Sequence, residues 1–340
     1  MGNQMRKTFI ITAVATLLAG TAVSAADTTL TISSYGGAYQ EAQSKSYFQP
    51  FMAQNPDIKI VEDSASSNAK LKAMVETGNV TLDLLLTDDS FGLEADAQWL
   101  EPIDYSIVDK SKFIAGAAGT YRVASDIEGT VLAYNANEFG GEAPQGFADF
   151  FDTKKFPGSR AVWKYAASGI FEVALIADGV KPEDLYPIDV ERALKKLDTI
   201  KSDLVWWESG SQSEQLLSSG EASMALVWVG RALGVAEKGI KIDWTNWTSQ
   251  TGYWVVPKGT KNKEAAMKAI SFFTEPAQQI EFTKYMPYGP SNKNALASVD
   301  NKFKGSLPTD HLDTRVLMNA DWWAENGAKV DLRFQEWLLQ

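Results

Sequence analysis

The side chains that could bind or transform a ligand in this chain are mainly aromatic rings, carboxylates and one well-placed arginine. The 340 residues include eleven tryptophans, no cysteine and a single histidine, His311. Without cysteine there is no disulfide, no thiolate nucleophile and no cysteine-ligated metal. One histidine excludes a multi-histidine metal site, so we expect neither metal nor cofactor. The net charge of −11 disfavours a nucleic-acid partner, because phosphate contacts need clustered lysine and arginine.

The first candidate binding segment is Ser34-Tyr35-Gly36-Gly37, between a predicted strand and a predicted helix. Glycine permits positive φ angles, so backbone N–H groups there can face a ligand. The start of a helix also carries partial positive charge, which suits a carboxylate or phosphate. The spacing differs from the dinucleotide-binding pattern G-x-G-x-x-G. A plain tight turn is the alternative.

The second candidate is Thr87-Asp88-Asp89-Ser90, directly after the apolar run 82–86. In open α/β sheets, ligands bind outside the carboxyl ends of the strands. Asp88 could therefore pair with an ammonium group. The alternative role for these residues is capping of the next helix, and we expect Asp89 to cap while Asp88 contacts the ligand.

Six of the eleven tryptophans fall between residues 206 and 254. Aromatic rings in a cleft give apolar walls and faces that attract ammonium groups. Core packing is the alternative for each ring. We expect Trp228 and Trp254 to face a cleft, because each lies at a strand end beside small residues, and Trp163 is a similar case.

Arg231 and Tyr288 complete the candidate site. Arg231 follows a buried strand and could bind a carboxylate through two hydrogen bonds, or form a surface salt bridge instead. Tyr288 begins the turn 288–292 and could point its ring or hydroxyl into a cleft. The G-x-S-x-G, P-loop and HExxH motifs are all missing, so we predict no enzyme. A secreted carbohydrate hydrolase is the alternative of another class, since carboxylate pairs abound.

The first 25 residues are predicted to be a secretory signal peptide. Arg6 and Lys7 precede the uncharged apolar run 9–18, and small residues lead to a cleavage site near Ala25 or Ala26. The run is too short to cross a bilayer. No cysteine stands at the cleavage site, so we expect a soluble periplasmic protein and no lipoprotein.

The mature chain alternates strand and helix patterns, which predicts an α/β fold. Strands are expected near residues 30, 58 and 84, with a helix over 38–55 that Pro50 kinks. Further buried strands are expected at 160–163, 224–228 and 253–257. No flexible linker is visible, so two lobes would be joined by strands, with crossings near 133–137 and 253–257.

Several segments together resemble the periplasmic solute-binding proteins of ABC importers, in the spermidine/putrescine-binding branch. They are Ser34–Tyr39, Asp83–Leu86, Phe156–Ser159, Ser219–Gly230, Val256–Ala266 and Tyr288–Asn292. The resemblance implies a type II binding protein with two α/β lobes, hinge strands and a ligand cleft between the lobes. It places 26–133 and 258–306 in lobe 1, and 134–257 and 307–340 in lobe 2. It also implies a monomer with a membrane permease as partner, and a cleft faced by Tyr35, Trp228, Trp254 and Tyr288.

The chain departs from the polyamine-binding pattern in its charges. Polyamine binders of this family carry acids on the second lobe, whereas 165–169 and 250–254 contain none here. Arg231 would repel a dication and attract a carboxylate. We therefore predict a small solute with both an amine and a carboxylate, such as 4-aminobutyrate, with Arg231 on the carboxylate and Asp88 on the amine. A polyamine, putrescine or spermidine, is the alternative ligand.

Overall fold

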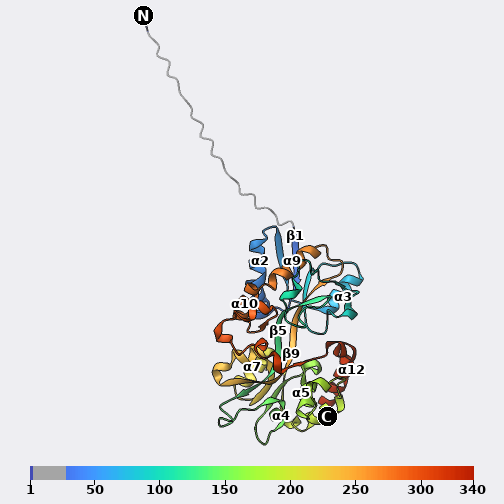
Figure 1. Cartoon of the computed structure of the whole chain (residues 1–340), viewed down its shortest axis with the longest axis vertical. Helices are drawn as coiled ribbons and strands as arrows, with labels where there is room; N and C mark the ends of the chain where they lie inside the picture. Colours follow the sequence, from blue (N-terminus) through green and yellow to red (C-terminus); the bar gives the residue numbers. More distant parts are fainter. Residues whose placement is uncertain (3–27) are drawn as a thin grey trace.

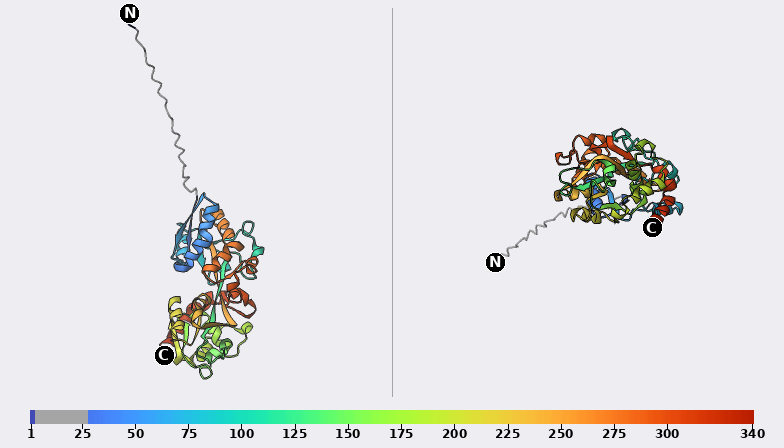
Figure 2. Two further views of the ribbon diagram at one scale, coloured as in Figure 1. Left: turned by 90° about the vertical axis from the view of Figure 1, so that its left-hand side faces the viewer. Right: turned by 90° about the horizontal axis from the view of Figure 1, so that it is seen from below.

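A computed structural model describes residues 1–2 and 28–340 of the chain. Apart from its first two residues, the predicted signal peptide lies outside the described residues. Within the described part, no helix combines the length and apolar character needed to cross a membrane. The described chain forms two bodies that lie end to end along the long axis of the molecule (Figures 1 and 2).

One mixed sheet runs through both bodies, with its central strands ordered β2-β1-β3-β9-β5-β8-β6-β7. The short strands β4 and β11 pair with β9, and β10 pairs with β5. The strands are β1 (Thr28–Ser33), β2 (Ile58–Asp63), β3 (Leu84–Thr87), β4 (Leu100–Glu101), β5 (Arg122–Asn135), β6 (Arg160–Trp163), β7 (Leu204–Trp207), β8 (Met224–Trp228), β9 (Ile240–Pro257), β10 (Gly289–Pro290) and β11 (Arg315–Leu317).

Lobe 1 is the body built on β1, β2 and β3, which pair in parallel as a buried α/β sheet does. Its core joins rings from both ends of the sequence. Phe51, for example, packs edge-to-face against Phe273 at a centroid distance of 5.8 Å. The helices of this lobe are α1 (Gly37–Gln43), α2 (Gln49–Gln54), α3 (Asn68–Glu76), α9 (Lys263–Phe273), α10 (Pro276–Tyr285) and α11 (Lys293–Leu296).

Lobe 2 is the body built on the parallel strands β6, β7 and β8. The C-terminal helix belongs to its core, because the ring of Phe334 packs edge-to-face against Phe171 at 5.8 Å. The helices of this lobe are α4 (Gly146–Phe151), α5 (Ile170–Ala177), α6 (Val190–Asp198), α7 (Gly210–Ser218), α8 (Val229–Gly234) and α12 (Ala320–Leu338).

The long strands β5 and β9 pass from one lobe to the other as an antiparallel pair (Figure 1). In β9, residues 253–255 pair with β3 of lobe 1. In β5, residues 130–134 pair with β8 of lobe 2. The strands therefore change partners inside their own length, near 125–129 and 247–252. The predicted boundaries at 133/134 and 257/258 are several residues too late, because hydrophobic runs do not reveal where a continuous strand exchanges neighbours.

The predicted helix over 38–55 forms, but the effect of Pro50 differs from a simple kink. A π-helical segment, Ser44–Phe48, lies between α1 and α2, and Pro50 sits in the first turn of α2. Proline cannot donate a backbone hydrogen bond, and a π segment shifts the helical register. The helix thus accommodates Pro50 by a change of register.

Candidate functional site

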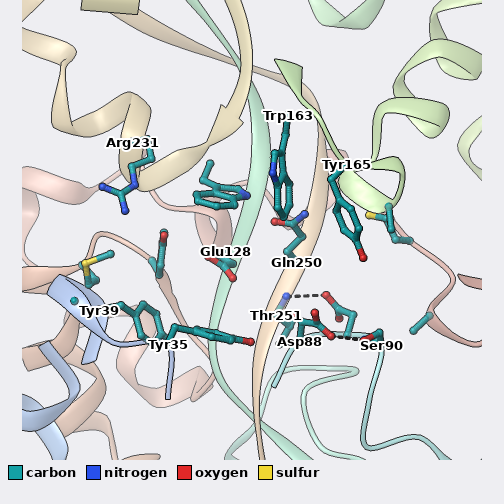
Figure 3. A pocket seen from close by; sticks show the side chains of 18 of the residues that line it. Tyr35, Tyr39, Asp88, Ser90, Glu128, Trp163, Tyr165, Arg231, Gln250 and Thr251 are labelled. Carbon is teal, nitrogen blue, oxygen red and sulfur yellow. Dashed lines mark hydrogen bonds between the residues drawn. The ribbon is translucent and has the colours of Figure 1, made fainter. Parts of the chain in front are cut away.

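A cavity of about 590 Å³ is lined by residues of both lobes and of the two crossing strands (Figure 3). Eight of the predicted site residues line it: Tyr35, Gly36, Gly37, Asp88, Trp163, Trp228, Arg231 and Tyr288. Lining residues outside the prediction include Tyr39, Asp89, Glu128, Tyr165, Gln250, Thr251, Met286, Met318 and Trp323. Ser34 and Trp254 are not among the lining residues.

The glycine turn brings Tyr35 to the cavity wall. Gly36 and Gly37 have φ angles of 72° and 56°, a backbone region that residues other than glycine rarely adopt. The Gly36 N–H donates to Gln40 Oε1 at 3.0 Å, so it serves the turn. Ser34 is a correction to the prediction: it is fully buried, and its hydroxyl donates to Gln43 Oε1 at 2.6 Å.

The two aspartates after β3 divide their roles differently from the prediction. Asp88 lines the cavity, and its Oδ1 also accepts from the Ser90 N–H at 2.9 Å. Asp89 does not cap a helix: its Oδ2 accepts from the Thr251 N–H of β9 at 2.9 Å. Burial raises the pKa of Asp89 to about 7, although the positive charge of Arg122 opposes that rise.

Glu128 of β5 is a cavity residue that the sequence reasoning missed. Burial raises the pKa of its carboxyl, and the negative charges of Asp126 and Asp89 add to the rise. Asp126, two residues earlier, accepts a hydrogen bond from the Tyr39 hydroxyl. Two acids spaced two apart in a mostly buried strand were the available signal, because such a strand normally buries no unpaired charge.

Lobe 2 presents a corner of aromatic rings to the cavity. Trp163 lies 4.9 Å from Tyr165 with the ring planes 48° apart, and 5.0 Å from Trp228 edge-to-face. Behind them, the fully buried Trp207 stacks on Trp163 at 5.5 Å. This backing fixes the orientation of the corner.

Trp254 is the second correction, because its ring belongs to the core of lobe 1. It is fully buried, and it packs against Phe48 and Phe273 at centroid distances of 6.4 and 5.6 Å. Side chains alternate between the two faces of a strand, and proximity to a strand end does not show which face meets the cleft.

Arg231 lies in α8, directly after β8, and reaches the cavity wall. Its Nη1 donates to Glu214 Oε1 at 3.0 Å, while its buried Nε has no partner in the structure. The salt bridge, which was the alternative role for Arg231, thus forms and leaves part of the guanidinium unpaired. Tyr288 packs beside Gly230, where an added Cβ would lie 2.9 Å from the tyrosine ring.

Another cavity wall comes from the C-terminal segment, through Met318, Ala320 and Trp323. Trp323 Nε1 donates to the fully buried Glu172 at 2.7 Å, and the Tyr186 hydroxyl donates to the same Oε1 at 2.5 Å. Burial raises the pKa of Glu172. Residues 28–340 contain no group of three or more His, Cys, Asp or Glu side chains placed to hold a metal ion.

Two α/β lobes, two crossing strands and a charged aromatic cavity between them define a class of protein that encloses a small solute. Residues 46–309 match the family model of the bacterial extracellular solute-binding proteins. The chain belongs to this family, so the resemblance seen in its sequence is confirmed, and the protein is a solute-binding protein.

Individual relatives narrow the comparison. The chain is 35% identical to the gamma-aminobutyric acid-binding protein of Pseudomonas aeruginosa, over 93% of this chain and 92% of the relative. It superposes on a structure of the Atu4243–GABA receptor with a TM-score of 0.86 and 37% identity, over 91% of this chain and 97% of that one. It is 23% identical to the spermidine/putrescine-binding periplasmic protein of Escherichia coli, over 53% of this chain and 55% of the relative.

Proposed function

We propose that the protein captures 4-aminobutyrate, or a short amino acid like it, in the periplasm and delivers it to the permease of an ABC importer. It does so as a monomer and without chemical change to the ligand. The observation that carries the proposal is the distribution of charge around the cavity. Arg231 of lobe 2 faces a cavity whose acids, Asp88, Asp89 and Glu128, come from lobe 1 and β5.

That distribution suits a zwitterion better than a polyamine. Arg231 binds the carboxylate, while Asp88 attracts the ammonium group. A diamine would place a second ammonium near the guanidinium, which costs free energy through like-charge repulsion. The names of two similar proteins, a gamma-aminobutyric acid-binding protein and a GABA receptor, point to the same ligand.

Isothermal titration calorimetry with 4-aminobutyrate, putrescine and spermidine tests the proposal. We expect one molecule of 4-aminobutyrate per protein, with no turnover. Arg231→Ala should weaken its binding by about 10- to 150-fold, the worth of a charge-assisted hydrogen bond. The matched control is Arg192→Ala, which removes an arginine of an exposed pair with Asp178 in lobe 2. Tight putrescine binding that survives Arg231→Ala would overturn the proposal.

A further inference from the structure

Aromatic rings from both lobes line the cavity near Asp88, where the proposed function places the ammonium group of the ligand. Tyr35 and Tyr165 are 47% and 44% exposed, although both line the cavity. Few large hydrophobic side chains of the described residues are as exposed to solvent as these two. Figure 3 shows both hydroxyls directed toward the region of Asp88, one from each lobe. The exposed ring faces are therefore available to a ligand.

The rings form two tilted corners. In lobe 1 the ring of Tyr35 lies 5.8 Å from that of Tyr39, with the planes 59° apart. In lobe 2 the rings of Trp163 and Tyr165 lie 4.9 Å apart at 48°. All four rings line the cavity, and a cation near an aromatic ring is attracted by the negative face of that ring.

The carboxylates beside these corners are already hydrogen-bonded in part. Asp88 Oδ1 accepts from both the N–H and the hydroxyl of Ser90, and Asp89 Oδ2 accepts from the Thr251 N–H. Asp88 supplies negative charge to the cavity, which attracts a cation whether or not that cation carries N–H donors. A cation without N–H donors needs charge and aromatic faces only, and both are present.

We propose that the ammonium subsite formed by the two aromatic corners and Asp88 accepts N-methylated ammonium groups, so that the ligands include trimethylammonium carboxylates as well as primary amino acids. This inference rests on the proposed function, because it keeps Arg231 as the carboxylate partner. The cavity of about 590 Å³ has room for the added methyl groups. Each methyl group also buries apolar surface against a ring, which adds favourable transfer free energy.

Three probes of equal chain length test the inference by calorimetry: 4-aminobutyrate, 4-(trimethylammonio)butyrate and 5,5-dimethylhexanoate, the isostere whose tert-butyl end is neutral. We expect the trimethylated compound to bind within about tenfold of 4-aminobutyrate, and the neutral isostere to bind at least about tenfold more weakly than the trimethylated compound. A trimethylated compound that binds more than about tenfold more weakly than 4-aminobutyrate, or an isostere that binds as tightly as the cation, overturns the inference.

The two proposals fail in distinguishable ways. Binding of 4-aminobutyrate without the trimethylated compound leaves the proposed function standing and removes the inference. Binding of the trimethylated compound without 4-aminobutyrate does the reverse. If neither binds, both proposals are wrong.

Variants locate the subsite. Tyr165→Leu should weaken binding of the trimethylated compound by about 3- to 30-fold, whereas Tyr165→Phe, which keeps the ring, should not. Tyr285→Leu is the matched control, because Tyr285 is equally exposed (47%) but does not line the cavity. An equal loss in the Leu and Phe variants would assign the effect to the hydroxyl and overturn the aromatic subsite.

Discussion

Asp89 shows how a single side chain can serve both the cavity and the stability of the fold. It follows β3 of lobe 1 and accepts a hydrogen bond from the backbone of β9, at the point where that strand passes between the lobes. Burial keeps its pKa near 7, compared with 3.8 for a free aspartate. The folded protein therefore holds a proton on Asp89 over a pH range in which the unfolded chain has lost it.

This difference gives the stability a definite pH dependence. Between about pH 4 and pH 7 the folded state binds more protons than the unfolded state, so the contribution of Asp89 to the free energy of unfolding decreases as the pH rises. In Asp89→Asn that slope should be shallower. The measurement is the Tm by circular dichroism between pH 5 and pH 8.

The control for this measurement is Asp104→Asn. Hydrogen bonds from Ser106 lower the pKa of Asp104, so this residue is ionised in both states throughout the measured range. Its variant should keep the slope of the wild type. Parallel Tm curves for the wild type and Asp89→Asn would show that Asp89 is not the titrating group.

At the scale of the elements, the C-terminal helix α12 is both part of the core of lobe 2 and a wall of the cavity. Its Trp323 donates a hydrogen bond to Glu172 of α5. The Glu172 side chain is fully buried and also accepts a hydrogen bond from the Tyr186 hydroxyl. Removing one partner from such a buried network leaves the donors without an acceptor, which costs more than the net value of a hydrogen bond.

Glu172→Leu should therefore lower the free energy of unfolding by about 1 to 3 kcal/mol and weaken ligand binding through displacement of Trp323. Urea unfolding followed by tryptophan fluorescence measures the first effect, and calorimetry measures the second. Glu191→Gln is the control, because Glu191 pairs with Arg333 of the same helix α12 while its side chain is 68% exposed. Exposed pairs contribute little to stability. Equal losses in both variants would contradict the role given to Glu172.

The strand and helix patterns predicted most of the elements, because each buried strand is a short apolar run bounded by turn residues. They predicted eight of the ten site residues as cavity-lining, since residues after strands converge at one end of a sheet. Trp254 and Ser34 are buried away from the cavity lining, and the predictions missed this because local sequence does not show which face of a strand or turn meets the core. Glu128 was missed because its strand crosses between lobes, which only long-range pairing reveals.

At the scale of the whole molecule, β5 and β9 are the long strands that join the lobes, and the cavity lies beside them. A two-lobed protein linked in this way can close by rotation about the strands. Ligand binding should therefore lower the radius of gyration in solution scattering. For the Arg231→Ala variant, a concentration of 4-aminobutyrate that saturates only the wild type should leave the radius of gyration unchanged. No change in the wild type would show that the ligand is taken up without closure.

The pairing of β5 with β9 also determines the order in which the two lobes can fold. The paired residues are over a hundred positions apart, and β9 completes the sheet of lobe 1 through its contact with β3. Lobe 1 therefore stays unfinished until nearly all of lobe 2 has been synthesised. Such distant contacts slow folding. A chain that folds late remains extended for longer, which is the state in which a polypeptide can still be threaded through a membrane pore.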